Sequence, residues 1–420
     1  MTALSAAIPA GNASLRRSEV AWLAMAVFGV SAGYGALLPL LPGWLMLMLP
    51  AATPVEIARH TGFASAVYAL GVLIGAPLWG FISDRVGRNL VLITGFAGYV
   101  VSLLALLVPV WVGLEGLYIL RGSTGFFVAA IVPLVSVIVA ERTGEAQRAR
   151  RFAWLGSMSL LGFLVGPAAI AAADGIGSSA GTGEMAPASI AQIVVLLTAA
   201  FGGVTMIGLL RVLQARPVAE RPPARFGPGR RYQNSLPLWG LGAVVMFVLA
   251  AFELGILLEG NREPQVSPRD VALMFAECSL VMLAVNALLF FTPILTAKSA
   301  HGLLGMGLLL AIAGLAVLSH QPAHGWMYLG VSLTAAGTGL VLPVLSYLAA
   351  GVSRADLAVT MGGLAAGASL GQTLGSAAGG WLFGVSPQHG FGWLALPLFV
   401  LLALLPFRRN LEKSLKPLNP

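Results

Sequence analysis

The sequence has little charge and almost no cysteine. Only 10% of its 420 residues are Asp, Glu, Lys or Arg, whereas soluble proteins carry about 25% charged residues. So few charges cannot cover the surface of a soluble protein of this length, and we expect much of that surface to face lipid. Disorder is excluded as well, because disordered chains are poor in apolar residues and 58% of this chain is hydrophobic. The single cysteine, Cys278, can form neither an intramolecular disulfide nor a cysteine metal cluster.

Sequence signatures of catalysis are missing too. No segment resembles a phosphate-binding loop, a zinc-binding helix or a Ser-His-Asp arrangement, so we expect no enzyme, no metal site and no cofactor. The net charge is +8, but the basic residues lie between apolar runs and form no basic face, which argues against a nucleic acid partner. The first apolar run, at about 20–41, is too long for a cleavable signal and indicates a permanent span.

Long apolar runs are what the sequence has in abundance. A bilayer core needs about 20 apolar residues per helix, and only helices or closed barrels satisfy their backbone groups in lipid. The runs are continuous and do not alternate, which favours helices. We therefore expect an all-α membrane protein with twelve transmembrane helices, at residues 20–42, 61–82, 90–111, 114–140, 151–173, 190–212, 236–258, 269–292, 302–319, 326–350, 357–384 and 389–407.

The basic residues lie mostly on one side of these spans. If both termini are cytoplasmic, 20 of the 24 lysines and arginines face the cytoplasm, three face outwards and Arg121 lies within a span. A missed or additional helix would invert every later loop and mix the charges, so this bias also supports twelve spans. Short loops and an arginine-rich, lysine-poor composition favour a bacterium. We expect a multi-pass protein of the cell inner membrane with both termini cytoplasmic.

The two halves of the chain resemble each other. VPLVSVIVA at Val132–Ala140 matches LPVLSYLAA at Leu342–Ala350, and LGFLVGPAA from Leu161 parallels LGQTLGSAA from Leu370 at nearly the same offset. Parallel repeats of this kind place a cavity between two bundles that rock to expose it alternately to each side. We expect six-helix bundles related by a pseudo-two-fold axis. Their ranges are 1–212 and 236–420, joined by a basic, proline-rich cytoplasmic linker at 213–235 that alternatively binds anionic lipid or a partner.

The loop between the second and third spans carries the most specific motif, GFISDRVGR at Gly80–Arg88. We expect Gly80 to let the second span end close to a neighbouring helix and Gly87 to permit a tight turn. Asp84 can cap a helix N-terminus, where its charge meets the positive end of the helix dipole. Together with twelve spans, this loop closely resembles the signature of the major facilitator superfamily.

The resemblance implies a role for this loop as a conformational latch. In the superfamily the loop stabilises the outward-facing state through contacts with the second half, a role that we transfer to Asp84 and Arg88. Glu141, at the inner end of the fourth span, is the expected partner of Arg88, and Arg85 can pair with an acid or the membrane surface. The alternative is that these residues are ordinary positive-inside loop charges.

Two further segments resemble motifs of the superfamily. LYILRGSTG places Arg121 in the fourth span, where the resemblance implies a role in proton coupling; the alternative is a structural arginine that bonds carbonyls or reaches the outer interface. GFLVGP places Gly162, Gly166 and Pro167 in the fifth span, similar to a motif of antiporters. We expect Pro167 to bend this helix and the glycines to contact its repeat mate in the eleventh span, although a generic helix bend explains the same residues.

Transport driven by a proton gradient requires a group that exchanges a proton, and a buried carboxylate is one such group. Glu277 reaches about the midplane of the eighth span and is our preferred proton carrier; the alternative is a structural hydrogen bond or buried pair. Glu253, nearer the outer end of the seventh span, is the second candidate; the alternative is a gate or interface residue. Polar and aromatic side chains within the spans are candidates for lining a substrate cavity: Tyr34, Tyr68, Asn286, Tyr347 and Gln372.

These observations predict a secondary active transporter. We expect a monomer that exports a small organic molecule, such as a drug, a metabolite or a siderophore, by proton antiport with alternating access. Its partners are the substrate, protons and the lipid bilayer. A proton-coupled importer or a uniporter of the same fold is one alternative, and a polytopic membrane enzyme or a scaffold is another.

Overall fold

A computed structural model describes most of the chain. The described residues are 15–107, 113–143, 145–179, 187–213, 232–260, 268–292, 294, 299–320, 324–350 and 357–404. Residues 214–231 of the linker expected at 213–235 lie outside these ranges, so the limits of the two halves stay a prediction.

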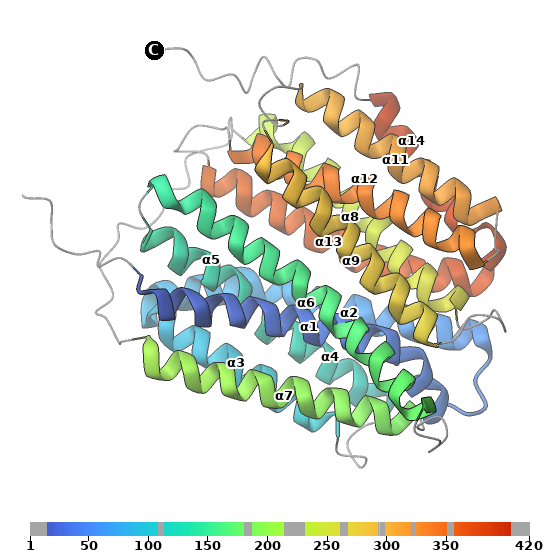
Figure 1. Cartoon of the computed structure of the whole chain (residues 1–420), viewed down its shortest axis with the longest axis horizontal. Helices are drawn as coiled ribbons and strands as arrows, with labels where there is room; N and C mark the ends of the chain where they lie inside the picture. The colour runs from blue at the N-terminus through green and yellow to red at the C-terminus, as the bar shows by residue number, and fades with distance from the viewer. Residues whose placement is uncertain are drawn as a thin grey trace, which may run out of the picture.

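Helices account for nearly all of the described residues (Figure 1). Because α4 and α5 follow each other within one span, Leu114–Glu141, the elements make up twelve transmembrane helices. Their bounds are α1 (Arg17–Met48), α2 (Pro54–Val86), α3 (Arg88–Ala105), α4 (Leu114–Val128), α5 (Val132–Glu141), α6 (Glu145–Ser179), α7 (Pro187–Val212), α8 (Tyr232–Gly260), α9 (Pro268–Phe291), α11 (Ala300–His320), α12 (His324–Ala350), α13 (Leu357–Val385), the 3-10 helix η1 (Pro387–His389) and α14 (Gly390–Leu404).

The twelve predicted spans are confirmed, and the structure extends several of them. The helix α2 begins at Pro54, whereas hydropathy predicts a start at residue 61. Thr53 provides the reason, because its side chain accepts a hydrogen bond from the backbone N–H of Glu56, while the Glu56 carboxylate accepts one from the backbone N–H of Thr53. This capping box, with a proline at the first position, stabilises a polar first turn that has no need of lipid.

Apolar composition alone identifies fewer than twelve helices. Ten helices in the described part of the chain are long and apolar enough to cross a membrane. The two others are α6, whose described apolar stretch is the shorter Trp154–Ala168, and α13, which is rich in glycine. Glycines of α13 stand at the positions that contact α8. The composition of this helix therefore reflects close packing against α8 rather than contact with lipid.

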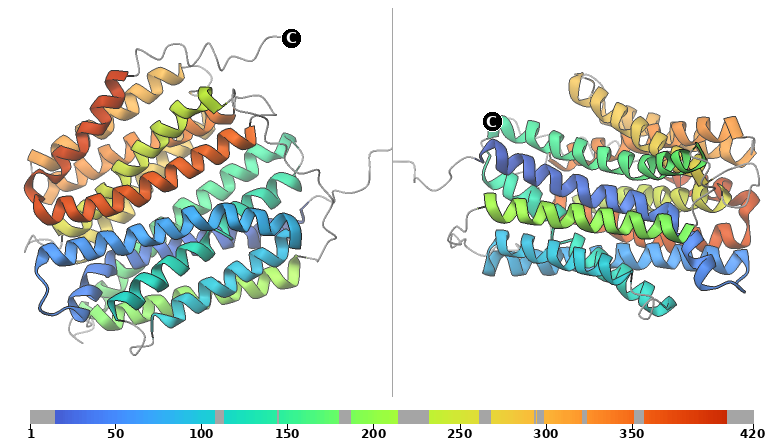
Figure 2. Two further views of the ribbon diagram at one scale, coloured as in Figure 1. Left: turned by 180° about the vertical axis from the view of Figure 1, so that it is seen from behind. Right: turned by 60° about the horizontal axis from the view of Figure 1, so that its bottom comes forward.

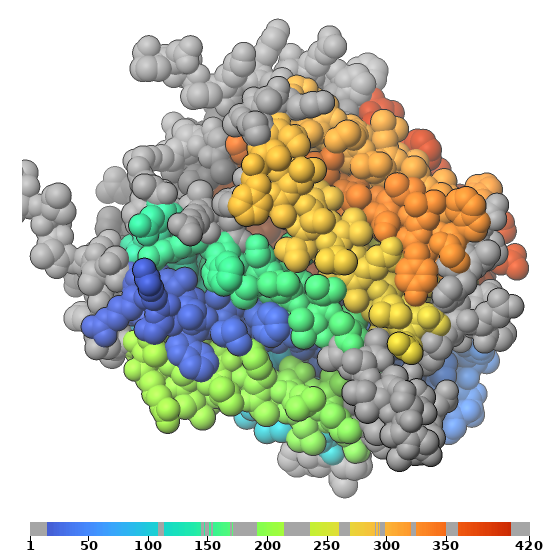
Figure 3. Space-filling view, in the orientation of Figure 1, coloured from blue at the N-terminus to red at the C-terminus, as the bar shows by residue number. Residues whose placement is uncertain are grey.

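The helices form two bundles. Helices α1 to α7 make up the first bundle and α8 to α14 the second, seen in Figure 1 as a blue-to-green group below a yellow-to-red group. Two helix pairs dominate the contact between the bundles, α2 with α13 and α6 with α9. Figure 2 shows α2 and α13 side by side, and Figure 3 shows α6 against α9 on the opposite face. Because the number of spans is even, the start of α1 and the end of α14 lie at the same end of the molecule.

The repeat seen in the sequence corresponds to equivalent local structure in the bundles. Ser136 in α5 donates a hydrogen bond to the carbonyl of Val132 at 3.2 Å, and its repeat mate Ser346 in α12 donates to the carbonyl of Leu342 at 3.1 Å. The packing is equivalent as well, because α6 lies against α1 in the first bundle as α13 lies against α8 in the second.

The expected contact between the fifth and eleventh spans is wrong. An added Cβ at Gly166 would lie 2.5 Å from the carbonyl oxygen of Ala32 in α1, and one at Gly162 would lie 2.9 Å from the backbone nitrogen of that same residue. These glycines therefore bring α6 close to α1, within the first bundle. The physical reason is the symmetry of the two bundles. It places α6 against α1 in the first bundle and its repeat mate α13 against α8 in the second. The helix α6 continues through Pro167.

Two glycines hold the bundles together at the end of the molecule opposite the described termini. Gly62 in α2 faces Gly380 in α13, and an added Cβ at Gly380 would lie 2.6 Å from both the Cα atom of Gly62 and the carbonyl oxygen of Ala58. Both obstacles are backbone atoms, so neither can rotate away. Glycine at these positions lets α2 and α13 approach each other closely.

Gly380→Ala should therefore destabilise the protein. Overpacking of this kind costs about 1–3 kcal/mol, so we expect a lower Tm for the purified variant in thermal unfolding. Gly305→Ala in α11 is the matched control, because no heavy atom lies within 4 Å of its added Cβ. Equal Tm values for the two variants would contradict the close contact.

Candidate functional site

A large cavity lies between the two bundles. Its volume is about 1550 Å³, and its walls come from α1 and α6 on one side and from α9 and α12 on the other. The lining includes the starts of α1 and α6, at Arg17 and Gln147, and the ends of α9 and α12, at Phe291 and Tyr347. All four of these helix ends belong to the end of the molecule where the described chain begins and ends. The cavity therefore reaches that end.

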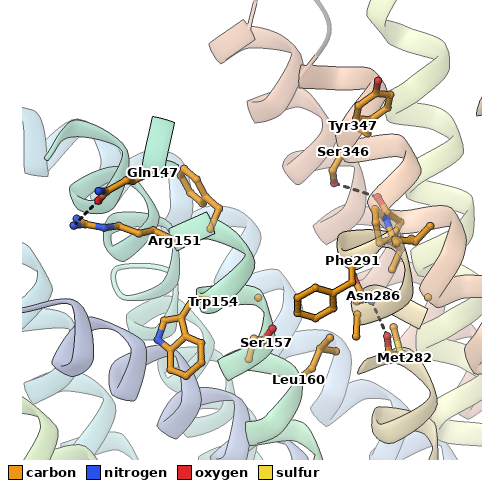
Figure 4. Close-up of a pocket in the computed structure, with 18 of the residues that line it drawn as sticks. Gln147, Arg151, Trp154, Ser157, Leu160, Met282, Asn286, Phe291, Ser346 and Tyr347 are labelled. Carbon is orange, nitrogen blue, oxygen red and sulfur yellow. Dashed lines mark hydrogen bonds between the residues drawn. The ribbon is translucent and has the colours of Figure 1, made fainter. Parts of the chain in front are cut away.

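The cavity wall is mixed in chemistry (Figure 4). Trp154 and Ser157 come from α6, and Phe291 projects from the end of α9 towards them. Asn286 donates a hydrogen bond to the carbonyl of Met282 at 2.8 Å, which fixes its amide beside the cavity. Such a surface, apolar and aromatic with a few polar groups, is typical of sites for small organic molecules, and the volume leaves room for water.

The predicted cavity residues separate into two groups. Asn286 and Tyr347 line the cavity. Tyr34, Tyr68 and Gln372 do not belong to its lining and instead lie together between the bundles. The amide of Gln372 in α13 donates a hydrogen bond to the hydroxyl of Tyr34 in α1 at 3.4 Å, and the rings of Tyr34 and Tyr68 are 5.0 Å apart. This second group forms a polar contact between the bundles.

Arg121 is the charge at the centre of that second group. Its side chain is 1% exposed, and its Cζ atom lies 4.9 Å from the centre of the Tyr68 ring. Its Nε and Nη2 atoms have no hydrogen-bond partner among the described residues. A buried guanidinium is costly without compensation, and the faces and hydroxyl dipoles of tyrosines provide a part of it. The structure thus places Arg121 inside the protein and away from the outer interface.

The two candidate carboxylates differ in their surroundings. Glu277 in α9 accepts a hydrogen bond from the Ser332 hydroxyl of α12 at 2.5 Å, while its buried Oε2 atom has no partner in the described part of the chain. Glu253 in α8 is half-buried and lies within electrostatic range of Tyr34. Glu277 therefore lies within the second bundle, whereas Glu253 is in electrostatic range of α1 in the first bundle. Ser332 gave no sequence signal, because a serine in an apolar helix is common.

The loop motif forms ion pairs within the first bundle. The Nη2 atom of Arg88 lies 2.7 Å from Oε1 of Glu141 and 3.1 Å from Oδ1 of Asp84. The expected partner of Arg88 is thus in place, and its role in a latch stays a prediction. Arg85 lies over the Phe81 ring, with 3.5 Å between its Cζ atom and the ring centre.

Two expectations about this loop are wrong. Asp84 caps no helix, because it lies in the last turn of α2, while the residue that precedes α3 is Gly87, without a side-chain cap. From this last turn of α2, the Asp84 side chain pairs with Arg88 at the start of α3. Gly80 packs against no neighbour in the described part of the chain, where no heavy atom lies within 4 Å of an added Cβ. Gly87 does form the turn, with a φ of 103°.

A metal centre finds no support in the described residues. Among them, no group of three or more His, Cys, Asp or Glu side chains is placed to hold an ion.

Comparison with known proteins identifies the family. The model of the Major Facilitator Superfamily matches residues 23–303. The chain belongs to the major facilitator superfamily. It is accordingly a multi-pass membrane transporter and not an enzyme.

Resistance proteins are among the similar relatives. The class G tetracycline resistance protein of Vibrio anguillarum is 34% identical over 149 residues, which cover 35% of this chain and 36% of that protein. Multidrug resistance protein 2 of Bacillus subtilis is 25% identical over 277 residues, or 63% of this chain and 64% of that protein. The matched segments thus span about a third of the first relative and less than two thirds of the second. Multidrug resistance protein 1 of Bacillus subtilis is 22% identical over 89% of this chain and 91% of its own.

Solved structures of superfamily transporters share the fold. The human organic anion transporter MFSD10 superposes with a TM-score of 0.71 at 18% identity, covering 93% of this chain and 99% of that chain. The nucleoside transporter NupG superposes with a TM-score of 0.69 at 12% identity, covering 93% and 100%. At these identities the likeness shows a common superfamily fold.

Gly87→Ala should strain the loop of this transporter. A side chain at a φ of 103° costs about 1–3 kcal/mol, so we expect a lower Tm for the purified variant. Gly80→Ala lies in the same motif and provides the control, because its Cβ meets no atom within 4 Å and alanine favours a helix. A Gly87→Ala protein that unfolds at the wild-type temperature would show that the turn tolerates any residue.

Proposed function

We propose that this transporter exports a small organic molecule in exchange for protons. The observation that carries the proposal is the cavity of about 1550 Å³ between the bundles, which reaches one end of the molecule, while Gly62 and Gly380 hold α2 against α13 at the other end. This is the geometry required by alternating access. The similarity to tetracycline and multidrug resistance proteins supports drugs or related metabolites as the cargo.

The charge distribution supports a cavity that faces the cytoplasm. The end that it reaches holds the basic loop at Gly80–Arg88 and the arginines at the starts of α1 and α6, as the positive-inside rule requires of a cytoplasmic surface. In the described residues, the ion pairs of Asp84 and Arg88 stay within the first bundle. A latch that joins the bundles in the outward-facing state would be released in this inward-facing arrangement. The bacterial relatives support a location in the inner membrane.

Proton coupling requires a carboxylate that changes its surroundings as the bundles move. Glu277 has one oxygen bound by Ser332 and one without a partner among the described residues. Glu253 interacts with Tyr34, whose hydroxyl also accepts from Gln372 and lies in electrostatic range of Arg121. Rocking of the bundles separates or joins the groups around Glu253, whereas Glu277 offers a proton the oxygen that has no partner among the described residues. Both glutamates are therefore candidates, Glu277 as carrier and Glu253 as carrier or gate.

The function is tested with the purified protein in liposomes under a pH gradient. We expect Glu277→Gln to lower gradient-driven tetracycline or dye efflux by at least about tenfold while substrate counterflow stays near the wild-type rate, because an amide neither gains nor loses a proton near neutral pH. Glu253→Gln should behave in the same way if it is the carrier, and should slow both modes if it is a gate. Glu115→Gln, an exposed acid in the first turn of α4, is the matched control.

Two outcomes would contradict the proposal. Full gradient-driven flux in the double variant Glu253→Gln/Glu277→Gln would exclude both glutamates as proton carriers. Proton-driven uptake into right-side-out vesicles, with no efflux under the opposite gradient, would establish an importer of the same fold.

A further inference from the structure

The charges of the cavity wall have one sign. Arg17 of α1 and Arg151 of α6 line the cavity, and no aspartate or glutamate is among its lining residues in the described part of the chain. Glu277 is five residues before Met282, the first residue of α9 in the lining, so it lies about 7 Å further along the helix. The candidate proton carriers are thus separate from the wall that a substrate contacts.

Arg151 of the cavity wall has neutral hydrogen-bond partners in the described part of the chain. Arg151 donates hydrogen bonds to the Thr143 hydroxyl at 2.9 Å and to the Gln147 side-chain oxygen at 3.5 Å, and neither partner carries a charge. Figure 4 shows the second of these bonds at the cavity wall. Arg17 is exposed, and the nearby Glu19 is 3.6 Å from Arg142 and also accepts from the backbone N–H of Arg16. Glu19 is therefore already engaged, and no acid is paired with Arg17 or Arg151 among the described side chains, so their charges remain for a ligand.

Aromatic rings are exposed on both sides of the same cavity. Trp154 of α6 is 50% exposed, and Phe291 of α9 and Tyr347 of α12 are 80% and 45% exposed. Rings from facing bundles offer stacking surfaces to a planar molecule. Asn286 adds a polar amide beside them.

We infer that the preferred substrate is an amphipathic aromatic anion, a planar ring system that carries a carboxylate or sulfonate. Its rings pack against Trp154, Phe291 and Tyr347, and its acid group lies towards Arg17 and Arg151. An aromatic cation of equal size finds the same rings but no carboxylate in the described wall, and it meets two like charges. This inference rests on the proposed function and specifies the substrate of the same cavity.

Binding of two xanthene dyes of opposite charge tests the inference. The full chain is placed in nanodiscs of neutral phosphatidylcholine, and fluorescence anisotropy measures the Kd of anionic fluorescein and cationic rhodamine 6G, with empty discs as blanks. We expect fluorescein to bind at least tenfold more tightly. Arg17→Gln and Arg151→Gln should each weaken fluorescein binding about fivefold or more without weakening rhodamine 6G, and Arg151→Lys should retain the preference because it keeps the charge.

The matched control removes an arginine at the same end of the molecule. Arg211 at the end of α7 lines a separate, smaller pocket between α1 and α7, so Arg211→Gln should leave both Kd values unchanged. Equal or tighter binding of rhodamine 6G, no binding of fluorescein, or an equal effect of Arg211→Gln and Arg151→Gln would each overturn the inference. Because no gradient is used, failure of proton antiport would leave this result intact, and the two proposals are tested separately.

Discussion

Close approach of helix backbones is the interaction on which this structure depends. Within lipid, two apolar helices gain little from hiding their side chains, so they associate by packing surfaces that fit. Glycines provide that fit between α2 and α13, at Gly62 and Gly380, and between α1 and α6, at Gly162 and Gly166. The first contact joins the two bundles and the second builds one of them. The cavity exists at one end of the molecule because the bundles are in contact at the other.

The helices were predictable from the sequence because the bilayer imposes one requirement on every span. Length, continuous apolarity and the side of the basic residues together gave twelve helices whose positions the structure confirms. The start of α2 at Pro54 was not predicted, because a capping box stabilises a polar turn that a hydropathy pattern does not detect. The helix α13 was predicted well although its glycines lower its hydropathy. The expected span of 357–384 agrees with the observed Leu357–Val385.

The site was less predictable, because contacts depend on helix rotation and a sequence does not fix rotation. Tyr34, Tyr68 and Gln372 were expected beside Asn286 and Tyr347, yet only the last two line the cavity. Gly80, Asp84 and the glycines of α6 were assigned neighbours that the structure does not give them. The Arg88–Glu141 pair could be predicted because both residues lie at helix ends on one side of the membrane, where few other charged partners are present. Ser332, the partner of Glu277, had no recognisable pattern.

The absence of a carboxylate from the described cavity wall bears on the energy source of the cycle. Exchange of one monovalent cation for one proton is electroneutral and feels no membrane voltage. Exchange of one monovalent anion for one proton transfers the equivalent of two positive charges inwards, and each charge is worth about 2.3 kcal/mol per 100 mV. If the cavity selects anions through Arg17 and Arg151 and exchanges them for protons, as we propose, transport would be electrogenic, and the resting potential of the cell would drive extrusion even when the two compartments have equal acidity.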